Sequence, residues 1–173
     1  NILAVTDEAD PYTDQSALIQ QNMEPLGLTF DAKSFERTTM YSKCNEPEAH
    51  VAICLAPAWG KDFPDGYTFA DPLFGSAAIF PSCCNYGLVG ASADLLSEAG
   101  YDITEVPSVD DQIKTANQQT GDARFQAWAD LDTTLMEQVV PWVPYLFDNN
   151  VDITSTRIIN YSFDQFAGLA AYD

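Results

Sequence analysis

A tryptophan and two aspartates lie close together in the stretch "AWGKDFPDG", residues 58–66. Trp59 and Asp62 follow an apolar run, "HVAICLAPAW", which predicts a buried strand. Parallel α/β sheets place ligand sites beyond the carboxyl ends of their strands, and an indole ring beside a carboxylate can hold an ammonium group that carries an apolar body. The residues alone support equally well a second interpretation, in which Trp59 fills the core and Asp62 is a solvated turn acid.

Asp62 and Asp65 flank Phe63-Pro64 and suggest two further kinds of site. Paired carboxylates can act as the acid and base of a glycosidase-like hydrolase, or they can bind calcium. However, aspartate beside proline is more often part of a turn in which it caps its own backbone, and the calcium-loop pattern D-x-[DN]-x-[DN]-G does not occur in the sequence. The turn is therefore the preferred interpretation, and neither a metal site nor a cofactor is predicted.

Nucleophile-plus-base catalysis has little support in the sequence. The one histidine, His50, precedes a predicted strand, where a surface or capping role is expected. Cys54 lies inside the apolar run and is interpreted as a small buried hydrophobic residue, whereas Cys44, Cys83 and Cys84 lie in polar or turn-rich surroundings. In an oxidising compartment, one disulfide between Cys44 and either member of the Cys83-Cys84 pair is expected.

The charge balance restricts the class of partner. The 173 residues include 7 Lys and Arg against 26 Asp and Glu, so the net charge is −19. Such a surface repels phosphate backbones and anionic lipid, which excludes nucleic-acid binding and favours cationic or zwitterionic ligands. Hydrophobic residues make up 46% of the chain, enough for a core. The opening "NILAVTDEAD" already reads as a strand, as expected of a fragment of a longer protein.

The first third of the chain alternates between strand-like and helix-like segments. Strands are predicted at 2–6, 28–32 and 51–55, and helices at 11–26 and 36–44, with Asp10 as N-cap and Gly27 as C-cap of the first helix. Alternation with such short connections predicts a parallel α/β sheet.

The rest of the chain is predicted to be mostly helical after one long irregular segment. Residues 57–90 combine many Pro and Gly with seven aromatic residues, which is typical of an ordered functional loop. Helices are predicted at 91–99, 109–119 and 122–139, an edge or crossover segment at 139–147, and a half-buried strand at 151–159.

Three segments in order resemble a known family. "AWGKDFPDGYTFADPLF", "NYGLVGASADLLSEA" and "DARFQAWADLDTTLMEQVVPWVPYLF" are similar to the C-terminal lobe of family 5 extracellular solute-binding proteins, the peptide/nickel-type receptors of ABC importers. The resemblance implies an α/β lobe of periplasmic-binding-protein type II, with a mixed sheet flanked by helices. Residues 1–140 would form this C-terminal lobe of a two-lobed receptor, and 141–173 would return toward the other lobe.

The resemblance also implies ligand-binding residues. In peptide-binding members, the aspartate of the tryptophan-acid motif pairs with the free α-amino group of the ligand, and this position matches Asp62. Trp59 would line the adjoining pocket, and Phe63 belongs to the aromatic-proline step that ends the strand at the cleft. Asn85 and Tyr86 match the Asn-Tyr step on the cleft side.

The function implied is ligand capture for an ABC importer rather than catalysis. The expected partners are a small-molecule or peptide ligand, such as an oligopeptide or another amine-bearing solute, and the membrane permease. The receptor would be a monomer outside the cytoplasm, periplasmic or lipid-anchored at the cell surface. Two alternatives are kept. A pocket facing both Asp62 and Asp65 would favour a small acidic hydrolase, and a coherent acidic patch with few aromatic residues would favour an interaction module.

Overall fold

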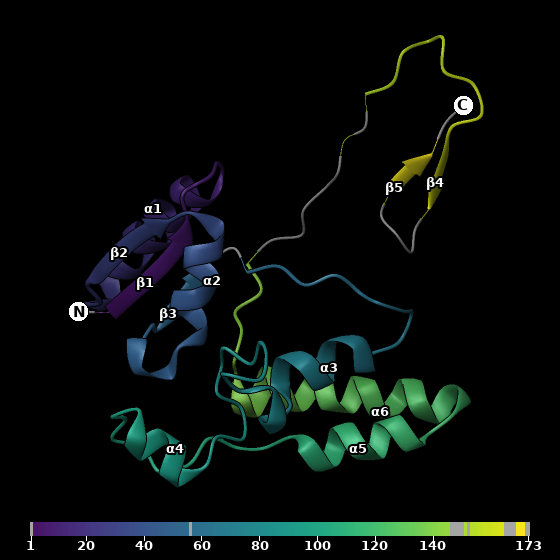
Figure 1. Ribbon diagram of the computed structural model, residues 1–173. Coiled ribbons are helices and arrows are strands. Elements are labelled where there is room, and N and C mark those ends of the chain that lie inside the picture. Colours follow the sequence, from purple (N-terminus) through teal and green to yellow (C-terminus); the bar gives the residue numbers. More distant parts are fainter. Residues whose placement is uncertain (1, 56, 146–150, 152, 165–168, 172–173) are drawn as a thin grey trace.

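The computed structural model describes residues 2–55, 57–145, 151, 153–164 and 169–171. Figure 1 shows an α/β unit built by the first part of the chain, a helical part that follows it, and a small hairpin near the C-terminus. Within the described residues, no helix is both long enough and apolar enough to cross a membrane.

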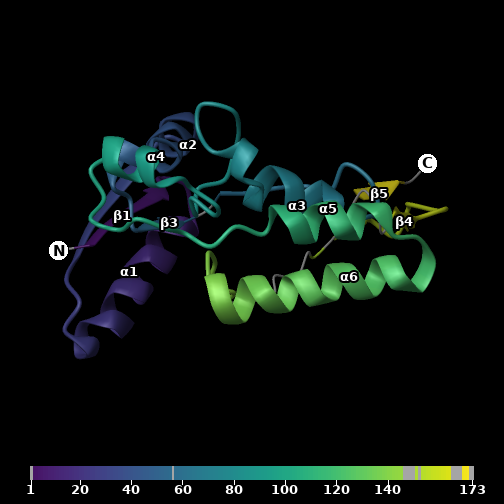
Figure 2. The same cartoon turned by 90° about the horizontal axis from the view of Figure 1, so that it is seen from below.

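The α/β unit is a three-stranded parallel sheet with one helix on each face. Strands β1 (Ile2–Asp7), β2 (Phe30–Phe35) and β3 (Ile53–Leu55) lie in the order β2-β1-β3. The connections contain α1 (Tyr12–Met23) and α2 (Arg37–Asn45). Because the chain leaves β1 in one direction and crosses back over it to reach β3, right-handed crossovers put the two helices on opposite faces, as Figure 2 shows.

The core of this unit forms where α2 packs on the central strand. Met40 and Val5 are buried together, and the side chain of Met40 lies against the sulfur atoms of Cys44 and Cys54, at 3.9 and 3.8 Å. A disulfide joins Cys44, on α2, to Cys54, on β3. The α2 helix therefore is tied to the sheet both by apolar contact and by a covalent bond.

The helical part consists of α3 (Tyr67–Phe74), α4 (Ala93–Glu98), α5 (Asp110–Gln118) and α6 (Gly121–Thr134), and α6 continues into a π-helical turn, Leu135–Val139. Short 3-10 helices span Glu24–Leu26, Pro47–Ala49 and Ser76–Ala78. Helices α3, α5 and α6 share a buried core to which Leu73, Val89, Val109 and Leu131 belong. Figure 1 shows these three helices side by side below the α/β unit.

The segment after α6 connects the helical part with the α/β unit. Its Trp142 ring packs edge-on against Phe74 of α3, with 5.1 Å between the ring centroids, and the Tyr145 hydroxyl donates a 2.8 Å hydrogen bond to the Gln15 side chain of α1. Farther along, β4 (Ser162–Asp164) and β5 (Leu169–Ala171) pair antiparallel as a separate two-stranded sheet. Among the described strands, antiparallel pairing is found in this hairpin only, whereas the three-stranded sheet is parallel throughout.

Several expected boundaries differ from the structure. Strand β2 begins at Phe30 rather than 28 because its register against β1 starts with Ile2 opposite Phe30, and β3 is shorter than 51–55. Asp10 is not the N-cap of α1, since Pro11 occupies that position without a side-chain cap. Gly27, with φ of +78°, does cap the turn that follows α1. His50 is exposed and caps the 3-10 helix Pro47–Ala49, in agreement with the predicted surface or capping role.

Two larger expectations were wrong. Residues 57–90 were expected to be irregular, but they contain the helix α3. The helix was not predicted because it has a proline, Pro72, in its interior. The predicted strand at 151–159 is absent from its described residues, where Ile153 is 94% exposed and has no sheet to pack against.

The predicted disulfide pairing was also wrong. Cys44 bonds to Cys54, which is therefore not a free buried thiol, and Cys83 bonds to its neighbour Cys84. The reason is that α2 packs on the central strand beside β3, so Cys44 and Cys54 meet in the same core around Met40, with their Cα atoms 5.9 Å apart.

Candidate functional site

The candidate site lies at the carboxyl edge of the parallel sheet, where the strand order changes direction. In the order β2-β1-β3 this switch point falls between β1 and β3, and α/β folds bind ligands in the crevice outside it. Strand β1 ends there at Asp7, and β3 ends at Leu55, which is followed by the loop 57–66 with Trp59 and Asp62. The loop that carries the predicted tryptophan-acid pair thus begins beyond this edge, and Figure 1 shows it running from the α/β unit to the start of α3.

The loop 57–66, here called the rim loop, is held in place by one buried threonine. The hydroxyl of Thr68 accepts a 2.8 Å hydrogen bond from the backbone N–H of Asp62 and donates a 3.0 Å bond to its carboxylate. The Thr68 carbonyl accepts a 2.9 Å bond from the indole N–H of Trp59. Thr68 is 3% exposed, whereas Trp59 is 36% exposed, so the indole does not fill the core. The side chains of Trp59 and Asp62 are therefore exposed to solvent, and both are held in place by hydrogen bonds to Thr68.

Pro72 leaves the Thr68 carbonyl free to accept the hydrogen bond from Trp59. In an α-helix the carbonyl of residue i accepts from the N–H of residue i+4, and proline has no N–H to donate. Pro72 lies in α3, four residues after Thr68, so the Thr68 carbonyl is left without its helical donor. The indole of Trp59 supplies that donor. The same proline that obscured α3 in the sequence therefore helps to position a rim residue.

The second half of the rim loop is docked on α6. Arg124 binds both carboxylate oxygens of Asp65, at 2.6 and 2.7 Å, and donates to the carbonyl oxygens of Ala116 and Asn117 at the end of α5. The Arg124 hydrogen bond lowers the pKa of Asp65 and raises that of Arg124 itself. Asp65 also accepts from the backbone N–H of Tyr67 at the start of α3, which agrees with the predicted capping of its own turn.

Gly66 permits the same docking because a side chain there would collide with α6. A Cβ atom on Gly66 would lie 2.7 Å from Cγ of Trp128, well inside van der Waals contact. Asp62 and Asp65 thus have different surroundings. Asp65 is held in a bidentate ion pair and stays ionised, while Asp62 is exposed at the rim. Because Asp65 is bound in this ion pair, it is not free to act with Asp62 as the acid-base pair that the hydrolase interpretation needs.

Asn85 and Tyr86, the other two predicted ligand residues, lie in the loop before α4. Asn85 is 1% exposed, and its amide nitrogen donates to the carbonyls of Gly75 and Val89 while its oxygen accepts from the N–H of Val89. Its side chain therefore fastens the loop from inside. Tyr86 is partly exposed, and burial raises the pKa of its phenol. Phe63, on the rim loop, is 45% exposed.

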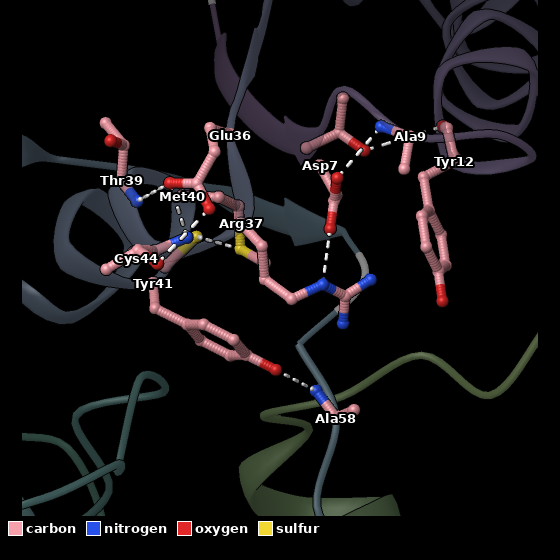
Figure 3. Close-up of polar contacts among 12 residues, drawn as sticks. Asp7, Ala9, Tyr12, Glu36, Arg37, Thr39, Met40, Tyr41, Cys44 and Ala58 are labelled. Atoms are coloured by element: carbon pink, nitrogen blue, oxygen red, sulfur yellow. Dashed lines mark hydrogen bonds and ion pairs between the residues drawn. The ribbon is translucent and has the colours of Figure 1, made fainter.

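An ion pair that the sequence reasoning missed closes the end of the central strand. Asp7, 2% exposed, accepts a 2.8 Å bond from the N–H of Ala9 and pairs with Nε of Arg37 at 2.7 Å. The guanidinium also lies over the ring of Tyr12, 5.5 Å from its centroid, and the Tyr12 side chain raises the pKa of Arg37. Figure 3 shows Arg37 between Asp7 and Tyr41. The sequence signal that could have indicated this ion pair is an acid at the end of a buried strand, since such an acid needs a basic partner and the chain has only seven basic residues.

A hollow of about 450 Å³ opens beside α2, next to this ion pair. Arg37, Tyr41 and Glu46 line it from the helix, and Phe80 and Tyr86 line it from the loop before α4. The rings of Tyr41 and Tyr86 stack with their centroids 6.5 Å apart. Neither Asp62 nor Asp65 lines this hollow. Among the described residues, no cluster of three or more His, Cys, Asp or Glu side chains is arranged to hold a metal ion.

Comparison with known proteins supports the fold. No family model and no curated protein matches the chain. The solved structure of "Clavulanic acid biosynthesis oligopeptide binding protein 2" is similar, with a TM-score of 0.58 and 21% sequence identity, over 80% of this chain and 24% of that one. This chain thus spans about a quarter of the length of that protein. The likeness confirms the predicted fold class, an α/β lobe of the periplasmic-binding-protein type with helices flanking its sheet.

Proposed function

We propose that this chain is the C-terminal lobe of a two-lobed receptor that captures a peptide or another amine-bearing solute for an ABC importer. The observation that carries the proposal is the rim loop that follows β3, in which Trp59 and Asp62 are exposed and both are held by Thr68 of α3. The fold of the oligopeptide-binding neighbour supports it, since the likeness extends over most of the chain. Residues 141–173 would return toward the other lobe.

In this proposal Asp62 anchors the ammonium group of the ligand. Its carboxylate is exposed, and the hydrogen bond described for it comes from a neutral hydroxyl, so its negative charge is available to a cation. The exposed ring of Trp59 supplies an apolar wall and a cation–π contact beside that charge, and Phe63 extends the wall. Asn85 supports the neighbouring loop from inside, and Tyr86 faces the hollow beside α2.

The receptor would act by capture and not by chemistry. Ligand contacts from both lobes would be complete only in a closed form, so binding would shift the population toward closure. The permease would then receive the ligand from the closed monomer. We place the receptor outside the cytoplasm because both disulfides of the described residues suit an oxidising compartment.

The test is ligand binding by the full-length protein with a charge-only substitution at the anchor. Mass spectrometry of the solute that co-purifies with the protein identifies the ligand, and calorimetry then measures its affinity for the wild type and for Asp62→Asn. Asparagine can still accept the Thr68 hydroxyl bond, so the variant removes the charge and keeps the loop. A charge-assisted bond contributes about 1.5–3 kcal/mol, which is on the order of a 10- to 100-fold loss of affinity.

Asp102→Asn is the matched control. Asp102 is an exposed acid in the loop after α4, so its substitution changes the net charge equally without touching the rim. We expect the affinity of this control to stay within about twofold of the wild type, as is usual for an exposed surface charge. Equal weakening by both substitutions would mean that the ligand responds to the overall charge of the protein and not to Asp62. A co-purifying ligand without a cationic group would rule out the anchor.

A further inference from the structure

The two disulfides of the described residues lie in different surroundings. The Cys44–Cys54 bridge joins α2 to β3 inside a core, where Cys44 is 7% exposed and both sulfur atoms lie against Met40. Cys83 and Cys84 are half-buried in the loop before α4, directly after two exposed residues. A thiol in solution therefore reaches the second bridge more easily than the first, and the more exposed disulfides of a protein are the ones that exchange with thiols.

The Cys83–Cys84 bridge contributes little to the stability of the whole chain. A disulfide stabilises a fold mainly by restricting the unfolded chain, and the effect grows with the number of residues that it encloses. Cys44 and Cys54 are separated by 10 positions, whereas Cys83 and Cys84 are neighbours, so their bridge closes the smallest loop that a disulfide can close. It joins the two side chains and the peptide unit between them in one ring. The structural effect of this bridge is therefore local to its own loop.

Residues 84–88, which begin at the bridge, contact three buried clusters of the described residues. Cys84 packs against the core shared by α3, α5 and α6. Tyr86 packs against the core of the α/β unit, and Leu88 packs against a third cluster that includes Leu96 of α4. Because only one residue separates each of these contacts from the next, a change in the backbone at Cys84 also changes the positions of Tyr86 and Leu88.

Hydrogen bonds and a ring contact connect the bridge with the rim loop. The carbonyl of Cys84 accepts a 3.0 Å hydrogen bond from the backbone N–H of Tyr86, whose ring stacks on that of Tyr41. The hydroxyl of Tyr41 accepts a 3.0 Å bond from the N–H of Ala58, which directly precedes Trp59, as Figure 3 shows for Tyr41 and Ala58. A short series of contacts thus runs from the disulfide to the first half of the rim loop.

We propose that Cys83-Cys84 is a reversible modification site for small thiols, which holds residues 84–88 and the rim loop in place when it is oxidised and loosens both when it is reduced. The reactant is a low-molecular-weight thiol. The inference goes beyond the proposed function and does not depend on it.

The reaction at this site is thiol–disulfide exchange. The small thiolate attacks Sγ of Cys83, because Cys84 is the member of the pair that packs into the helical core. A mixed disulfide forms on Cys83, and Cys84 leaves as a thiolate that takes a proton. A second small thiol then attacks the sulfur of the first, so that Cys83 leaves as a thiol and the two small thiols form a disulfide. The cysteine pair gains two electrons and two protons, and the two small thiols lose them.

The first experiment treats the full-length protein with increasing 2-mercaptoethanol, a neutral thiol that the negative charge of the protein does not repel. Iodoacetamide then alkylates every free thiol, and mass spectrometry locates the alkylated cysteines. We expect Cys83 and Cys84 to be alkylated at a thiol concentration about tenfold below that needed for Cys44 and Cys54. Alkylation of Cys83 and Cys84 without any added thiol, or of all four cysteines at the same concentration, would overturn the inference.

The second experiment measures the two loops by hydrogen exchange. After selective reduction, the amides of residues 84–90 and of the rim loop should exchange about tenfold faster, as in a segment that opens locally, while those of β1 keep their protection. Removal of the thiol and reoxidation should restore the original rates. The double variant Cys83→Ser/Cys84→Ser should show the fast rates without thiol and no further response to it. The matched control, Cys44→Ala/Cys54→Ala, keeps the Cys83–Cys84 bridge and should respond to the thiol as the wild type does.

Three outcomes of the exchange measurement would contradict the inference. Unchanged rates in both loops would mean that the bridge does not hold them. Faster exchange in residues 84–90 alone would mean that Tyr86 and Tyr41 do not connect the bridge with the rim loop. Loss of protection in β1 would mean that reduction unfolds the protein instead of loosening two loops. The Asp62→Asn binding test uses the oxidised protein, so the proposed function stands or fails separately.

Discussion

Substituting Thr68 by valine tests whether one buried hydroxyl organises the rim loop. Valine has nearly the same shape as threonine, but it removes the acceptor of the Asp62 N–H and the donor to the Asp62 carboxylate. The bond from Trp59 goes to the backbone carbonyl of residue 68, so it survives the substitution. The variant thus detaches Asp62 while leaving Trp59 attached.

The expected magnitude follows from the two bonds. A neutral hydrogen bond contributes about 1 kcal/mol and one to a charged group about 1.5–3 kcal/mol, but Asp62 is exposed and water replaces part of the loss. We therefore expect the free energy of unfolding to fall by about 1–2 kcal/mol, and the thermal midpoint to fall by about 2–8 °C in a chain of this size. Ligand affinity should fall by about three- to tenfold because the anchor carboxylate is no longer fixed.

Denaturant unfolding followed by tryptophan fluorescence measures the stability, and calorimetry measures the affinity. Thr68→Ser is the matched control, since it keeps the hydroxyl and loses only a buried methyl group. It should retain the affinity of the wild type while losing about 1 kcal/mol of stability. If Thr68→Val binds ligand as tightly as Thr68→Ser, the hydroxyl does not position Asp62 and the account of the rim loop given above is wrong.

Three further outcomes are expected. Arg124 lowers the pKa of Asp65, so the stability from this pair is fully present above the unfolded pKa of about 3.9 and is lost as pH falls through the lower folded value; acid titration should destabilise the wild type more than Arg124→Met over that interval. Replacing Cys44 and Cys54 together by alanine should lower the free energy of unfolding by about 2–3 kcal/mol, because the bridge closes a short loop, and unchanged denaturant midpoints would contradict this. Asn85→Ala should cost about 3 kcal/mol by breaking three buried hydrogen bonds, measured by denaturant unfolding, and a loss below 1 kcal/mol would show that the loop is fastened otherwise.

The sequence predicted the α/β unit well because its signals are local. Apolar runs marked β1 and β3, and the glycine at 27 marked the end of the first helical segment. The boundaries of β2 shifted because the register depends on pairing with β1, which no local pattern contains. Helix α3 was missed since Pro72 usually argues against a helix interior, yet the donor that it lacks is replaced by an indole from outside the helix.

The site was harder to predict because its members depend on contacts between distant segments. Trp59 and Asp62 could be singled out by their position after a buried strand, but their common support, Thr68, had no distinguishing pattern. Asp65 looked like a simple turn residue, although its bidentate partner lies 59 residues later. Asn85 matched a ligand-binding step in sequence and is buried in three dimensions, because a loop closes around it.

The three aspartates near the candidate site, Asp7, Asp62 and Asp65, differ in the partners of their carboxylates. Asp7 and Asp65 are largely buried, and each is paired with an arginine, so their charges are neutralised inside the protein. Asp62 is exposed, and the partner described for its carboxylate is the neutral hydroxyl of Thr68. A hydroxyl fixes the direction of a carboxylate without cancelling its charge. Two arginines from a chain that has only seven bases are therefore used on structural acids, while the Asp62 carboxylate is exposed and held at a fixed position on the rim, which is the combination that an anchor for an ammonium group requires.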